Sequence, residues 1–483
     1  MPAAAVRLRT GGRGVCGSAS RAASSGPPAG GTNKGASIRA AASRDRCSVL
    51  VSYYLFIVFG VALGATGVLL PAQLRDYRVD QATIGATFVA NSVGFVLASI
   101  VTGPLGHRFG IRRMVLASSL VFTGASLLAA SRPPIVALVA AAFVAGMATG
   151  SGEAVLNAYL VGLPDATPLL NRLHAFFGVG ALLGPLAAAS LLTVTGWPAV
   201  MLLIAALALV PAAAGWLTFP ARHVDPLLIG YPGSPPGPTP VAGPVSLAKP
   251  ESFPESESFP RSVPVEPRPG GRRALLTVVR QPAVLWAGAM LCVYVGLEAG
   301  VGNWGYTYLV DARSVSALLA GYTASGYWFG LTAGRFLATP ATTRLGLTST
   351  RLLSVCMVGV TVAGALLWAA PGTAGLASLS FVPLGFFLGP IFPTTMAIVH
   401  QLTDAHLVPT AIGALGAGGV AGGAVFPWLA GTIIQLAEPW TLPPFALLLA
   451  AAQLALWRVL SRRIATASAA AGAARLTPGP LTE

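Results

Sequence analysis

The chain has 483 residues, of which 54% are hydrophobic and only 9% charged, and its mean hydropathy is +0.72. Soluble globular proteins carry about 25% charged residues, so this composition excludes a water-soluble protein and indicates an integral membrane protein. The net charge of +15 does not indicate nucleic-acid binding, because the basic residues lie in tails and alternate loops and form no basic face interleaved with aromatics. The four cysteines have no metal-ligand spacing, and we expect neither a metal site nor a cofactor.

The N-terminal segment, residues 1–48, is rich in Ala, Gly, Ser and Arg. It lacks the apolar core of a signal peptide. We predict a disordered basic cytoplasmic tail here, and a start codon assigned too far upstream would explain the same composition.

Twelve apolar stretches follow, each long enough to cross a bilayer, since a helical span needs roughly 20 apolar residues. They are 49–72, 82–106, 114–131, 134–163, 173–194 and 198–219, then 282–309, 317–339, 352–370, 373–399, 408–435 and 440–460. Residues 220–281, between the two sets, are rich in Pro and Ser and cannot form a packed core. We therefore predict an all-α membrane protein with a six-helix bundle at 49–219, a cytoplasmic linker at 220–281, a second bundle at 282–463 and a cytoplasmic tail at 464–483.

The basic residues predict the orientation. If the N-terminus is inside, 26 of the 30 Lys and Arg residues are cytoplasmic, and the outer loops keep only Arg75, Arg78, Arg132 and Arg313. Cytoplasmic loops are enriched in Lys and Arg. We expect a multi-pass protein of the cell membrane with both termini in the cytoplasm.

The two halves are related by an internal duplication. With a shift of 236 residues, Gly85, Gly94, Pro104, Arg108 and Gly110 match Gly321, Gly330, Pro340, Arg344 and Gly346. With a shift of 238, Gly178, Gly180 and Gly184 match Gly416, Gly418 and Gly422. Each half has an even number of spans, so the copies share one orientation. Such parallel repeats are typical of transporters with a midplane site between the halves.

The loop after the second span carries a motif. Residues 103–113 read GPLGHRFGIRR. Here the sequence resembles the major facilitator superfamily, whose motif at this loop is G-x-x-x-D-[RK]-x-G-x-[RK]-[RK]. The matching residues are Gly103, Arg108, Gly110, Arg112 and Arg113, while His107 stands where the family has an aspartate.

This resemblance covers residues 49–463 and implies the superfamily's twelve-helix fold, with the motif loop controlling the conformational change. The family's aspartate helps to hold the halves together, so His107 puts that clamp in doubt. A plain positively charged anchor at the membrane surface is the alternative role for the loop. Stretches such as 150–160, 294–309 and 385–395 resemble the fucose permease-like branch, which includes proton-coupled sugar symporters. The fucose symporters carry an acid in the first helix, and this chain has none there, so fucose itself is not assumed.

Two acids lie deep within the predicted spans, Glu153 and Glu298, and Asn157 follows Glu153 by one helical turn. A charge at that depth costs about 2.5 kcal/mol or more, and intramembrane acids are candidates for function. We predict that Glu153 couples transport to protons, and that Asn157 forms a hydrogen bond with its carboxyl group or with the solute. The alternative for both acids is a protonated carboxyl that only links neighbouring helices.

Three more residues accompany Glu298. Asn303 and Trp304 follow it and are candidates for substrate contact, although Trp304 equally fits an aromatic residue of the membrane interface. Arg335 is a possible charge partner for a buried acid, and a side chain that extends to the cytoplasmic surface is the alternative.

A transporter, an intramembrane enzyme and a channel differ in the sequence features that they require. The chain has no P-loop, which excludes ATP as the energy source, and no HExxH or GxSxG, which leaves little support for an intramembrane enzyme. Isolated acids in a duplicated scaffold do not suit the lined pore of a channel. We expect a monomeric secondary transporter that carries a small solute, such as a sugar or a sugar-like metabolite, across the lipid bilayer and is coupled to protons. The alternative is an efflux transporter of amphipathic small molecules.

Overall fold

The computed structural model describes residues 32–163, 166–219, 271–369 and 374–476, and these residues form helices without any β-strand. Residues 1–44 and 45–483 form two separate units, and both helical halves of the chain belong to the second. The predicted tail at 1–48 overlaps the start of the first helix, and its residues 1–31 lie outside the described part. Most of the predicted linker, 220–270, and the last residues, 477–483, also lie outside it.

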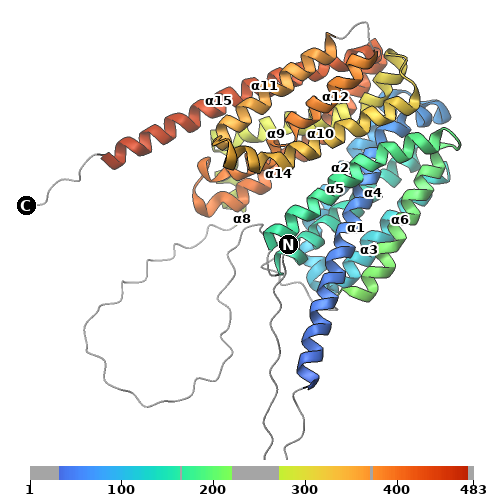
Figure 1. Ribbon diagram of the computed structural model, residues 1–483, viewed down its shortest axis with the longest axis horizontal. Coiled ribbons are helices and arrows are strands. Elements are labelled where there is room, and N and C mark those ends of the chain that lie inside the picture. The colour runs from blue at the N-terminus through green and yellow to red at the C-terminus, as the bar shows by residue number, and fades with distance from the viewer. Residues whose placement is uncertain (1–31, 164–165, 220–270, 370–373, 477–483) are drawn as a thin grey trace, which may run out of the picture. The chain divides into compact units, whose positions relative to one another are not determined.

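The first half contains six long helices, coloured blue to green in Figure 1. They are α1 (Thr32–Tyr77), α2 (Gln81–Phe109), α3 (Ile111–Ala130), α4 (Ile135–Val161), α5 (Ala166–Leu192) and α6 (Trp197–Thr218). Each overlaps one of the first six predicted spans, and its ends differ from the predicted ones by a few residues at most, apart from the longer starts of α1 and α5.

The second half begins with a short helix, α8 (Gly271–Val279), at the end of the predicted linker. The long helices that follow are α9 (Pro282–Thr307), which continues into a π-helical turn at Tyr308–Ala312, α10 (Ala317–Arg344), α11 (Ser349–Trp368), α12 (Ala374–Leu388), α14 (Val408–Ala437) and α15 (Leu442–Leu476). The short α13 (Ile391–Ala397) continues the path of α12 after Gly389 and Pro390.

Among the described residues, eleven helical segments are long and apolar enough to cross a membrane. The helix that falls short is α10, whose 28 residues include many Gly and Thr and two Arg. It nevertheless packs against α5 and α12 at the position of the eighth predicted span. The prediction of an all-α protein with two six-helix halves is therefore confirmed.

The internal duplication is visible in the backbone. Asp80 and Ser316, which are 236 residues apart, both cap the N-termini of their helices, α2 and α10. Gly110 and Gly346, at the same spacing, have φ of 80° and 64°. A side chain is strained at such angles, which explains why glycine recurs where these helices end.

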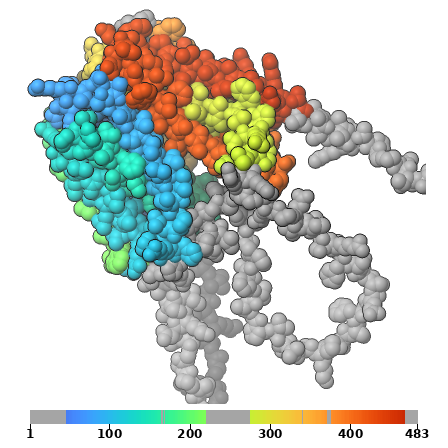
Figure 2. Space-filling view, turned by 180° about the vertical axis from the view of Figure 1, so that it is seen from behind, coloured from blue at the N-terminus to red at the C-terminus, as the bar shows by residue number. Residues whose placement is uncertain are grey.

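The two halves meet through pairs of helices, α2 with α14 and α5 with α10. Figure 2 shows the first half, in blue to green, beside the second, in yellow to red. We call the end where α6 ends and α8 begins the linker end, and the opposite end, where α2 begins and α14 ends, the far end. At the far end Gly85 lies against Trp428 and Gly431 lies against Gln81.

Candidate functional site

A cavity of about 450 Å³ lies between the halves and is lined by residues of both. Its wall is mostly apolar, with seven aromatic rings: Phe56, Phe59, Phe88, Phe95, Phe122, Phe177 and Trp328. Amides from Gln73, Asn91 and Asn303 add hydrogen-bonding groups. Mostly apolar walls with a few polar groups are typical of small-molecule sites.

Glu153 lines this cavity from α4. The residue is half-buried, and among the described residues its carboxyl group has no hydrogen bond or ion pair. No charged side chain lies close enough to act on it electrostatically. The structure therefore offers no helix-linking hydrogen bond for this carboxyl, which favours the functional interpretation.

The glycines beside Glu153 explain how α4 holds it there. A Cβ atom at Gly150 would collide with the backbone of Phe95 on α2, and one at Gly152 would collide with Ser118 on α3. These glycines thus let α4 pack closely against two neighbours. Asn157, one turn further along α4, does not line the cavity.

Glu298 lines the opposite wall, from α9, and it is paired. A guanidinium nitrogen of Arg335 on α10 lies 3.4 Å from its carboxylate, and the exposed fractions of the Arg335 and Glu298 side chains are 32% and 15%. The hydroxyl of Tyr327 donates to the backbone carbonyl of Glu298 at 2.9 Å. Arg335 therefore serves as the charge partner that the sequence suggested, and its guanidinium is held within the second half.

Asn303 and Trp304 take different places. Asn303 lines the cavity. Trp304 is completely buried, its indole N–H donates to the carbonyl of Pro427 at 2.7 Å, and its ring packs edge-on against Phe88 of the other half. The structure thus places Trp304 in the contact between the halves, outside the cavity wall and away from the surface.

The motif at 103–113 lies at the linker end, and most of it is helical. Helix α2 continues to Phe109, so only Gly110 separates it from α3. Hydropathy marks only the apolar part of a helix, so the last residues of α2 are missing from the predicted span.

Two arginines of this motif lie over aromatic rings of their own half. The guanidinium of Arg112 lies 4.0 Å from the ring centre of Trp216 on α6, and that of Arg108 lies 5.4 Å from the ring centre of Phe109. His107 and Arg113 are exposed, and Gly103 is half-buried.

At the far end, Gln435 of α14 holds the start of α2. Its amide N–H donates to the Asp80 carboxylate at 3.1 Å, and its oxygen accepts from the N–H of Ala82 at 3.2 Å. Hydrogen bonds from Thr83, together with a smaller contribution from Gln435, lower the pKa of Asp80 from its ordinary value. We call Asp80, Ala82 and Gln435 the far-end latch.

Most of the cavity wall was not predicted from the sequence, including Asn91, Gln73 and Trp328. Asn91 donates to the carbonyl of Ala142 at 3.1 Å, which joins α2 to α4. Asn91 could have been found from the sequence, because an amide in the middle of the apolar stretch 82–106 is unusual. The aromatic wall residues could not, because lipid-facing helices are also rich in Phe.

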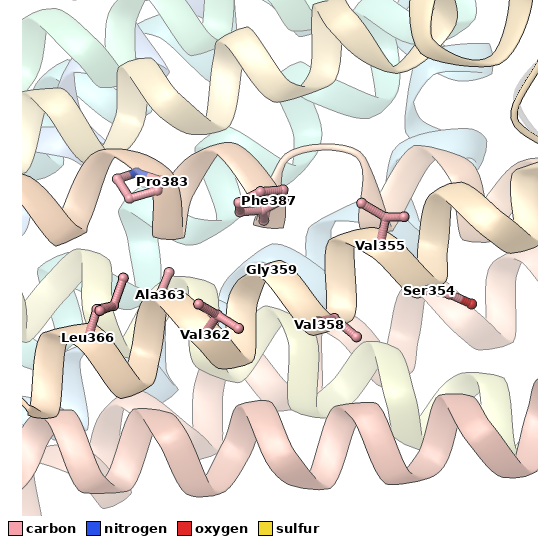
Figure 3. A pocket seen from close by; sticks show the side chains of 9 residues that line it. All are labelled: Ser354, Val355, Val358, Gly359, Val362, Ala363, Leu366, Pro383 and Phe387. Atoms are coloured by element: carbon pink, nitrogen blue, oxygen red, sulfur yellow. The ribbon is translucent and has the colours of Figure 1, made fainter. Parts of the chain in front are cut away.

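A second hollow, of about 520 Å³, lies between α11 and α12. Figure 3 shows Pro383 and Phe387 of α12 facing Val362 and Leu366 of α11 across it. Its one polar side chain, Ser354, accepts a hydrogen bond from the Trp457 indole at 2.8 Å. Without a charged or amide group to orient a solute, this hollow is not the candidate site.

The profile of the Major Facilitator Superfamily matches residues 53–427, which is most of the chain. The chain belongs to this superfamily. It is similar to the bypass of stop codon protein 6 of Saccharomyces cerevisiae, with 23% identity over 402 residues, 80% of this chain and 77% of that protein. It is also 29% identical to the 4-hydroxybenzoate transporter PcaK of Pseudomonas aeruginosa, over 34% of this chain and 37% of that transporter.

Solved structures share the fold. The nucleoside transporter NupG superposes with a TM-score of 0.63 at 14% identity, covering 87% of this chain and 98% of that one. A bacterial homolog to the human lysosomal transporter Spinster gives a TM-score of 0.62 at 13% identity, covering 91% and 99%. The protein is thus a multi-pass membrane protein with a transporter fold. These similarities do not confirm the finer resemblance to the fucose permease-like branch.

Proposed function

We propose that this superfamily member is a secondary transporter that carries a small organic solute by alternating access and couples the movement to protons. The observation that carries the proposal is the free carboxyl group of Glu153 in a cavity shared by both halves.

Alternating access is supported by the duplicated architecture. The cavity takes residues from both halves, and the far-end latch is a small contact made by exposed side chains. Two similar bundles that rock about a central site expose that site to one side at a time. The positive-inside rule orients the linker end towards the cytoplasm. We further propose that the membrane is the cell membrane.

Proton coupling is supported by the isolation of Glu153. A lone charge in the membrane interior is costly, so this carboxyl takes up a proton or another cation before it is enclosed. Glu298, in contrast, is neutralised by Arg335. Coupling of this kind permits symport into the cell and also export in exchange for protons.

The cavity wall favours an amphipathic solute with an aromatic or other apolar body, because rings outnumber amides. A sugar is the second candidate, since Trp328 and the amides of Asn91 and Asn303 occupy one cavity and flat rings with amides suit sugar faces.

The test is solute-evoked proton movement in proteoliposomes. Solutes that stabilise the purified protein in a thermal-shift screen of sugars and amphipaths are added outside vesicles that contain a pH dye. We expect a saturable change of internal pH for at least one solute, and no saturable change in vesicles without protein. Uptake or release of a hit without any proton movement would contradict the coupling. A rate that never saturates would indicate a channel, and a chemically altered solute would indicate an enzyme.

A further inference from the structure

We propose that the transported solute is a cation with an apolar body, and that its charged nitrogen and the proton compete for the carboxylate of Glu153. This inference rests on the proposed function, because it names the class of substrate for the same cavity.

The first step concerns charge. Among the described residues that line the cavity, two are acids and none is Lys, Arg or His. The Glu298 carboxylate is already occupied by Arg335 at 3.4 Å. The free charge-bearing group that remains is the carboxyl of Glu153, so the wall can complement a cation and has no free cation for an anion.

The second step concerns the ionisable groups next to residues of the wall. Tyr294 on α9 and Arg335 and Tyr327 on α10 neighbour Glu298, and the His174 ring on α5 packs against Phe56. Arg335 acts on His174 and on Glu298, but none of these groups acts on Glu153. A ligand at Glu153 therefore meets that carboxylate without competition from a protein cation.

The third step concerns the body of the solute. Phe59, Phe95 and Phe122 line the same cavity as Glu153. Aromatic faces attract cations as well as apolar groups. Trp328, which is 5% exposed, adds its ring to the wall, and its indole N–H has no partner among the described residues.

Competition at one carboxylate sets the stoichiometry. The carboxyl group holds either one proton or one monovalent cation, so a loaded cation leaves when a proton binds on the other side. The result is an electroneutral exchange of one cation for one proton. This places the protein apart from the 4-hydroxybenzoate transporters that it resembles, whose named substrate is an acid.

Three naphthyl compounds of the same size test the charge directly: naphthylmethylamine, naphthylmethanol and naphthoate. Binding to purified protein is measured by equilibrium dialysis, with empty micelles as the blank. We expect the amine to bind at least about tenfold more tightly than the alcohol, and naphthoate to bind more weakly than either. Equal or weaker binding of the amine would overturn the proposal.

The variant Glu153→Gln should remove the preference for the amine and leave binding of the alcohol within about twofold, which also reports that the variant is folded. If this variant does not fold, Glu153→Asp, which keeps the charge, should retain the preference. A preference that persists in Glu153→Gln would also overturn the proposal.

A measurement of proton movement distinguishes a failure of the cationic-substrate proposal from a failure of the proposed proton-coupled transport. In proteoliposomes with an internal pH dye, we expect the amine alone of the three to evoke proton movement beyond that in vesicles without protein, where the uncharged amine and naphthoic acid cross the lipid unaided. If naphthoate or the alcohol does so and the amine does not, the coupled transporter stands and the cationic substrate is wrong. If no solute, from these three or from the wider screen, evokes proton movement, both proposals fail.

Discussion

At the scale of single residues, two acids of the same type have different environments in one cavity. Glu153 has no partner among the described residues, and Glu298 is paired with Arg335 and lies beside Tyr327. Sequence alone could not separate them, because the pair joins residues 37 positions apart on two helices. The contact depends on how α9 and α10 are rotated about their own axes, and hydropathy carries no information about that rotation.

Removal of one partner of this pair should destabilise the protein. In Glu298→Gln the guanidinium of Arg335 keeps its charge without a counter-ion, and we expect a loss on the order of 2 kcal/mol, since the pair is only partly buried. The double variant Glu298→Gln/Arg335→Gln should recover part of that loss. Denaturation in detergent measures all three proteins, and additive losses would contradict an interacting pair.

Arg108 should affect rate rather than affinity. It lies at the linker end in the last turn of α2, and it does not line the cavity. Arg108→Ala is expected to slow transport severalfold while the dissociation constant of the solute stays within about threefold. Arg351→Ala, an exposed arginine elsewhere in the chain, is the matched control. Lost binding in a folded Arg108→Ala protein would place this residue in the site instead.

At the scale of helices, much of the fold follows from the sequence, because long apolar stretches and the glycine spacing determine where helices lie and which ones correspond. The departures have physical causes. Helix α2 extends beyond its apolar part, and α12 gives way to α13 at Gly389 and Pro390. The short helix α8 combines buried Ala274 and Val278 with exposed leucines, a pattern too brief for a span.

The far-end latch should hold the closed state at that end. Gln435→Glu puts a second carboxylate next to Asp80, and like charges repel, so the far end is expected to open more often. Opening of the far end can be measured with a cysteine in place of Thr66, which lines the cavity, in a protein without other cysteines. A membrane-impermeant thiol reagent reacts with this cysteine only when the cavity is open. We expect faster labelling from the far side in Gln435→Glu, and Gln435→Asn is the neutral control.

Acidity should act on the latch in the same direction. Hydrogen bonds to the charged carboxylate lower the pKa of Asp80, so the latch is complete at neutral pH and weakens as the pH falls through that lowered value. In the cysteine-labelling test above, a labelling rate that is the same with and without Gln435→Glu would mean that the latch does not hold the far end closed.

At the scale of the whole molecule, two related six-helix halves enclose one cavity. The halves and their duplication were predictable from the sequence, as was Glu153, because a lone acid in an apolar stretch is visible without coordinates. The wall of the cavity was not, since its described residues come from nine helices whose facing sides depend on packing. The chemistry of transport therefore depends on an arrangement that only the fold reveals.

The most direct measurement of the central claim compares two transport modes of Glu153→Gln in proteoliposomes. A glutamine cannot exchange a proton, so the account predicts that pH-driven accumulation of solute is abolished, while exchange between preloaded and external solute continues when the solute concentration is raised to offset the weaker binding of Glu153→Gln. Asp404→Asn, a change of an exposed acid outside the cavity, should leave both modes intact. Accumulation against a gradient by Glu153→Gln would show that this carboxyl is structural and that coupling lies elsewhere.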